Sequence, residues 1–141
     1  MLLFELDMFK GVIKMKRHKA REKAFQTLFQ IDMNEVEPTV AINHILENEK
    51  NDEFLTYLVE GVIDNKQSID DTISKHLENW TLPRLASVER TLLRIATFEI
   101  LYSEEIPENV SINEAVELAN KYGEEKSGRF VNGVLSKILP S

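Results

Sequence analysis

A compact run of basic side chains is the strongest chemical signal in this sequence. Residues 16–23 read KRHKAREK, with five lysines and arginines against one acid, Glu22. This octamer therefore carries +4, and because the whole chain carries −7, the remainder must carry −11. Lysine and arginine bind phosphate oxygens through charge-assisted hydrogen bonds. An acidic chain with one basic segment indicates a local contact with a polyanion, and not a general attraction to nucleic acid.

Two phenylalanines follow the basic run at helical spacing. On a helix, Arg17 and Arg21 lie four residues apart on one side, and Phe25 and Phe29 continue along the adjoining flank. Arginines beside aromatic rings suit single-stranded RNA, whose bases splay out and stack on such groups. Two other interpretations stay open. The basic run could be a solvated helix end that binds nothing specific, and the two phenylalanines could belong to the core.

A second group of charged residues follows further along the chain. Arg90 and Arg94, next to Glu89, are four residues apart on one predicted helix, a like-charge pair that is mildly unfavourable unless an acid lies nearby. That acid could be RNA phosphate or an acidic partner. The favoured interpretation is an intramolecular pair with one of the many carboxylates.

Other chemistry has little support. His18, His44 and His76 lie in different segments without a metal-ligand spacing, and the five glycines are isolated, so no phosphate-binding loop is predicted. The absence of cysteine excludes disulfides and thiolate metal sites. A catalytic serine or threonine could still be assembled in space, but no local pattern supports one. We therefore predict no metal, no cofactor, no catalytic residue and no enzymatic activity.

The elements that must position these residues are helices. Apolar residues recur at spacings of three and four, and no useful strand-like alternation is present. Pro38 suits a first helical residue, Asn65–Ser68 could kink or end a helix, and Ser111 with Glu114 forms a capping-box pattern. Gly123 is expected to provide a left-handed stop. The predicted helices cover about residues 16–33, 38–46, 54–63, 69–77, 85–102, 112–122 and 127–138.

These patterns predict an all-α protein of about seven helices in two packed small bundles, residues 15–80 and 81–141, divided near Trp80–Pro83. The helix over 85–102 is apolar almost all the way round, so we place it at the centre. Residues 15–141 are expected to form one domain, and residues 1–14, which precede a second methionine, an N-terminal extension outside the fold. No apolar run approaches the roughly 20 residues that a membrane span needs, and we expect a cytoplasmic protein with no membrane association.

Four segments together resemble the NusB family in the right order and spacing, over Met15–Ile138. They are KRHKAREKAFQTLFQID, VERTLLRIATFEI, IPENVSINEAVELANKYG and SGRFVNGVLSKI. The resemblance implies an all-helical fold of two small bundles and a role in transcription antitermination. It implies that the chain binds boxA, a short single-stranded RNA element, together with the ribosomal protein NusE. The pair would then join NusA, NusG and RNA polymerase, notably on ribosomal RNA operons.

The resemblance also implies which residues bind RNA. The arginine-rich contact of the family falls on Lys16, Arg17, His18, Lys19 and Arg21, and three further residues match positions near the RNA and partner edge: Glu89, Lys126 and Phe130. His18 stands where arginine is more usual, and Lys126 where an acid is common. Two alternatives remain: a domain of the kind fused to rRNA cytosine methyltransferases, or a non-catalytic protein-interaction module. The sequence leaves open whether the protein is a monomer or a homodimer.

Overall fold

The structure, a computed structural model, describes residues 15–139; the predicted extension over residues 1–14 lies outside the described residues. Residues 15–139 contain seven α-helices, one 3₁₀ helix and no strand, which confirms the all-α prediction. The elements are α2 (Arg17–Asn34), α3 (Pro38–Leu46), α4 (Glu53–Asp64), α5 (Lys66–Lys75), η1 (Leu82–Arg84), α6 (Ser87–Tyr102), α7 (Glu108–Tyr122) and α8 (Ser127–Ile138).

Local sequence accounts for several helix starts. Pro38 is the first residue of α3, as predicted, because its fixed φ suits a helix start and its missing N–H costs nothing there. Asp52 caps α4, accepting hydrogen bonds from the backbone N–H groups of Phe54 and Leu55 at 3.0 and 3.3 Å. Asn65 separates α4 from α5, so the predicted break in this segment is confirmed.

Two predicted features of α7 are wrong. The helix begins at Glu108, directly after Pro107, and Ser111 therefore lies in its first turn and does not cap it. The Ser111 hydroxyl instead donates to the buried carboxylate of Glu99 at 2.8 Å. Gly123 ends the helix in extended conformation (φ −98°, ψ −163°) and not in the left-handed one. Glycine is needed there for space, because a Cβ would lie 2.6 Å from Ser127 Oγ.

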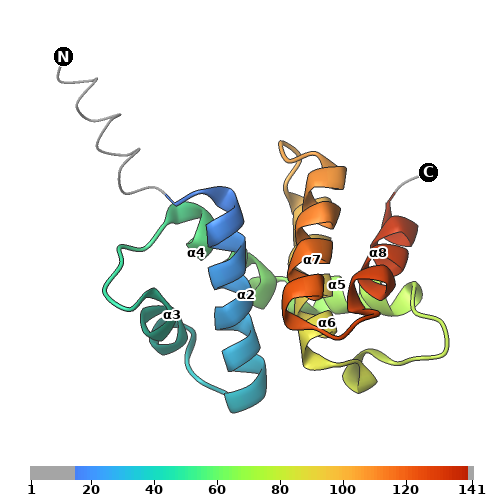
Figure 1. Cartoon of the computed structure of the whole chain (residues 1–141), viewed down its shortest axis with the longest axis horizontal. Helices are drawn as coiled ribbons and strands as arrows, with labels where there is room; N and C mark the ends of the chain where they lie inside the picture. Colours follow the sequence, from blue (N-terminus) through green and yellow to red (C-terminus); the bar gives the residue numbers. More distant parts are fainter. Residues whose placement is uncertain (1–14, 140–141) are drawn as a thin grey trace.

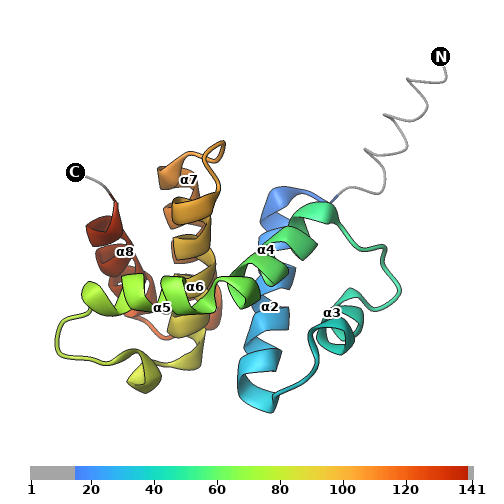
Figure 2. The ribbon, with the colours of Figure 1, turned by 180° about the vertical axis from the view of Figure 1, so that it is seen from behind.

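The helices form two groups (Figures 1 and 2). Helices α2, α3 and α4 make the first, and α5, η1, α7 and α8 gather around α6 in the second. Because α5 buries Ile69 and Ile73 and packs on α6 and α8, the chain passes between the groups at Asn65, earlier than the predicted joint at Trp80–Pro83. One continuous hydrophobic core spans both groups.

Helix α6 is the centre of the fold, as its apolar circumference predicted. It packs against α2, α4, α5, α7 and α8, and its buried residues include the carboxylate of Glu99. A charge at this depth requires a partner, since an unpaired buried carboxylate is costly. Its partner comes from the basic segment of α2. Among the described helices, none is both long and apolar enough to cross a membrane.

Candidate nucleic-acid interface

The start of α2 collects four exposed basic residues: Lys16, Arg17, His18 and Lys19. Lys16 is the N-cap residue, its side chain makes no capping hydrogen bond, and the first turn of the helix contains no acid. A helix N-terminus carries partial positive charge, so cations there cost stability while anions are favoured. The backbone N–H groups of a first helical turn also suit phosphate. The arrangement is poor for an isolated helix and well suited to binding an anion.

An aromatic ring from another helix holds Arg17. The guanidinium carbon of Arg17 lies 4.2 Å from the centroid of the Phe54 ring on α4, and that of Arg21 lies 5.1 Å from it. A cation over an aromatic face is attracted by the ring quadrupole. Phe54 therefore restrains Arg17 while leaving the residue exposed to solvent.

Two lysines of the segment, Lys19 and Lys23, both form ion pairs with Glu49. Lys19 Nζ lies 2.6 Å and Lys23 Nζ 3.2 Å from the Glu49 carboxylate, in the loop after α3. The hydrogen bonds from Lys19 and then Lys23 hold the pKa of Glu49 below its ordinary value. Lys19 and Glu49 are both exposed, and such pairs contribute little. A phosphate can therefore displace Glu49 from Lys19 at low cost.

Arg21 differs from the other members of the predicted site because it is buried, with 4% of its surface exposed. Its Nε and Nη2 donate to the Glu99 carboxylate at 3.0 and 2.7 Å, and Ser111 donates to the same group. The paired geometry is the fork that arginine makes with a carboxylate. The predicted contact of Arg21 with a ligand would require this pair to open.

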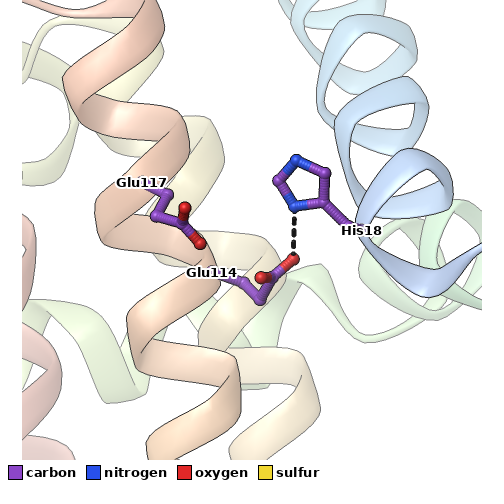
Figure 3. Close-up of side chains that lie close together, drawn as sticks. All are labelled: His18, Glu114 and Glu117. Atoms are coloured by element: carbon purple, nitrogen blue, oxygen red, sulfur yellow. Dashed lines mark hydrogen bonds and ion pairs between the residues drawn. The ribbon is translucent and has the colours of Figure 1, made fainter.

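His18 brings α2 against α7 (Figure 3). Its Nδ1 lies 3.0 Å from Glu114 Oε1, and Glu117, one turn further along α7, lies beside the same ring. The three ligand atoms, one from each side chain, lie within 4.8 Å of one another. Since His18 and Glu114 are 96 residues apart, sequence spacing could not reveal this group.

The three remaining predicted residues form a second group at the start of α8. Glu89 on α6 accepts a hydrogen bond from Ser127 at 2.8 Å, which ties α6 to this helix start. Lys126 is exposed, and Phe130 is half-buried against the core. Because α2 and α7 run side by side in the same direction (Figure 1), this group lies beyond the end of α7, apart from residues 16–19.

A set of contacts between α2 and α7 connects the two groups. Glu22 accepts hydrogen bonds from Lys121 at 2.5 Å and from the Tyr122 hydroxyl at 2.6 Å. These two bonds hold the pKa of Glu22 below its ordinary value, while burial and the bond to Glu22 raise that of Tyr122. Phe25 is buried against the Tyr122 ring, with centroids 4.9 Å apart, so the core interpretation of Phe25 is confirmed.

Arg90 and Arg94 pair within the molecule, which confirms the favoured interpretation. Arg90 Nη2 donates to Asp32 at 2.7 Å, and Arg94 Nε donates to Asp70 at 2.8 Å. Burial raises the pKa of Asp32, but the hydrogen bond and charge of Arg90 and the charge of Arg94 outweigh it, so this pKa is lowered. These arginines join α6 to α2 and α5 and are engaged in the fold.

Known proteins are similar to nearly the whole length of this chain. The model of the NusB family matches residues 18–140. "Transcription antitermination protein NusB" of Oceanobacillus iheyensis is 62% identical over 125 residues, which are 89% of this chain and 99% of that protein. The protein of the same name from Bacillus subtilis (strain 168) is 53% identical over 124 residues, or 88% of this chain and 95% of that one.

Solved structures show the same similarity. NusB of T. maritima superposes with a TM-score of 0.81 at 38% identity, covering 89% of this chain and 91% of that one. A chain from the crystal structure of antitermination factors NusB and NusE in complex with double-stranded RNA gives a TM-score of 0.77 at 34% identity, covering 88% and 97%. The chain belongs to the NusB family.

Proposed function

We propose that this protein is an RNA-binding transcription antitermination factor that binds boxA RNA together with the ribosomal protein NusE. The observation that carries the proposal is the start of α2, where residues 16–19 expose four basic side chains at the positive end of a helix whose first turn contains no acid. It is supported by the relatives named for antitermination and by the relative solved with NusE and RNA.

Within this proposal, the exposed residues of the segment contact the RNA directly. Lys16 and Lys19 bind phosphates, and Arg17 offers its guanidinium plane for stacking while Phe54 supports it from behind. His18 adds an exposed imidazole beside them, whose Nδ1 lies 3.0 Å from Glu114 Oε1. Arg21 acts as a positioning residue, because its pair with Glu99 anchors the first turn of α2 on α6 and α7.

The second group provides the other end of the proposed surface. Lys126 at the start of α8 offers a further cation, and Phe130 beside it presents a partly exposed ring. Glu89 fixes this helix start through Ser127 and so keeps both side chains in place. Helices α2, α7 and α8 lie toward one face of the molecule (Figure 1), so a single strand bound along α2 and α7 would reach both groups.

The proposed role is an assembly role and not a catalytic one. The protein with its RNA and NusE would join NusA, NusG and RNA polymerase in the cytoplasm, on ribosomal RNA operons in particular. We expect NusE to raise the affinity for RNA, and thermodynamic linkage then requires that RNA raise the affinity for NusE by the same factor.

The experiment is fluorescence anisotropy of a labelled boxA-like RNA, with and without NusE, at two salt concentrations and beside a scrambled RNA. The test variant is Arg17→Ala/Lys19→Ala. Its matched control is Lys66→Ala/Lys75→Ala, which removes the same charge from exposed positions on α5, toward the opposite face (Figure 2). The proposal expects tighter, salt-sensitive binding with NusE that only the first variant loses. No preference for boxA with NusE present would instead indicate a protein-interaction module.

A further inference from the structure

We propose that His18, Glu114 and Glu117 form a binding site for a divalent transition-metal ion of the zinc class, between the first turn of α2 and the middle of α7 (Figure 3). One imidazole nitrogen and two carboxylate oxygens are ligands that zinc accepts, and three protein ligands leave a coordination position open. The inference does not depend on RNA binding and concerns residues at the edge of the proposed RNA surface.

The geometry of the three side chains carries the proposal. Their ligand atoms already lie within 4.8 Å of one another, with His18 Nδ1 and Glu114 Oε1 at 3.0 Å. Ligands around a tetrahedral zinc ion, each about 2.0–2.2 Å from it, stand a little over 3 Å apart. A change of rotamer at the exposed Glu117 is therefore enough to complete the set.

The negative charge of the two carboxylates is only partly compensated by neighbouring cations. Glu117 has no hydrogen bond or ion pair with any residue in the described range 15–139. Glu114 has His18 at 3.0 Å and one guanidinium nitrogen of Arg21 at 3.6 Å, but the main bonds of Arg21 go to Glu99. Two carboxylates thus face one imidazole, and a divalent ion would balance their negative charge.

Both helices that supply the ligands are held in place independently of the proposed ion. The buried Arg21–Glu99–Ser111 network joins α2, α6 and α7 next to the site, and Glu22 joins α2 to Lys121 and Tyr122 one turn further along. The ligand positions are therefore largely preorganised, which lowers the cost of binding. The Glu114 side chain is only 17% exposed, so its rotamer is restricted as well.

The test is isothermal titration of the full chain with zinc chloride in a buffer that does not chelate metals, beside NMR of the histidine imidazoles. We expect one ion per chain and a shift of the His18 resonances. His18→Gln and Glu117→Gln should each weaken binding by about tenfold or more, a loss of about 1.4 kcal/mol or more. Matched controls are His44→Gln on α3 and Glu60→Gln on α4, which change the same residue types at exposed positions.

The controls make the result decisive. Binding that His44→Gln weakens as much as His18→Gln, or no saturable binding at one ion per chain, overturns the proposal. Circular dichroism of each variant checks that the fold is kept, and Glu117→Gln removes no hydrogen bond or ion pair within residues 15–139, so its folding should be unaffected. A negative outcome would leave the RNA proposal untouched, because no RNA is present in this experiment.

Discussion

Replacing Arg17 and Arg21 one at a time should separate RNA binding from folding, although the two residues are four apart on one helix. Arg21→Ala leaves the Glu99 carboxylate, 1% exposed, with only the Ser111 hydroxyl as a hydrogen-bond partner among residues 15–139. Removing one partner of a buried ion pair costs about 3–5 kcal/mol, because the other charge stays buried without compensation. Arg17→Ala removes an exposed side chain and its cation–π contact with Phe54, worth about 0.5–1 kcal/mol.

The assay is thermal unfolding followed by circular dichroism at 222 nm, beside RNA titration of each variant. For a chain of 141 residues, about 3 °C of Tm accompanies each kcal/mol, so Arg21→Ala should lower Tm by about 10 °C and Arg17→Ala by less than about 3 °C. Affinity for RNA should follow the opposite order at temperatures where both variants are folded. Arg17→Ala should lose about tenfold, the contribution of one stacked and paired guanidinium.

A double substitution controls for the general effect of altering the core. Arg21→Met with Glu99→Leu removes both charges and keeps side chains of similar length, so it should recover most of the stability that Arg21→Ala loses. If Arg21→Ala unfolds at the same temperature as Arg17→Ala, the buried pair does not stabilise the fold as we infer. If Arg21→Ala keeps its stability but loses RNA affinity, Arg21 contacts the ligand directly and the positioning role is wrong.

Four further predictions test other parts of the structure. Gly61→Ala should lower the free energy of unfolding, measured with urea, by about 1–3 kcal/mol, because a Cβ would overlap the buried Phe98 ring. In the same measurement, Gly133→Ala on α8 should raise it by about 0.5–1 kcal/mol, because a Cβ there meets nothing within 4 Å. Because the pKa of Asp32 is lowered in the folded protein, it adds stability that is present above its ordinary pKa of 3.8 and is lost as the pH falls through the folded pKa. In Asp32→Asn, Tm should therefore fall less steeply with decreasing pH below about pH 4. The same dependence of Tm on pH in variant and parent would contradict this. With phosphate contacts at Lys16, Lys19 and Lys126, the logarithm of RNA affinity should fall with the logarithm of salt at a slope of about −2, and Lys19→Ala should make that slope shallower by about 0.7. Phe130→Ala should weaken RNA or NusE binding with a small change in Tm, and a large fall in Tm without a binding change at permissive temperature would make Phe130 a core residue.

The helices and the family could be predicted from local sequence patterns. Helical spacing of apolar residues predicted the all-α class, and the positions of Pro38 and Asn65 marked a helix start and a break that the structure confirms. The concentration of cations at residues 16–23 indicated an anion-binding segment, because charge is counted directly from residue types. These features are local, so neighbouring residues suffice to predict them.

The roles of individual side chains could not be predicted in the same way, because they depend on how the helices pack. Arg17 and Arg21 look equivalent in sequence, yet one is exposed over Phe54 and the other is buried against Glu99, 78 residues away. Ser111 matches a capping-box pattern in the sequence, but its hydroxyl donates a hydrogen bond to the Glu99 carboxylate. The three candidate metal ligands come from segments 96 residues apart. Burial and ion pairing depend on which helices meet in space, and several arrangements of seven amphipathic helices fit the same local pattern. Packing around α6 selects one of them, and this packing decides which charged side chains are buried in ion pairs and which stay exposed.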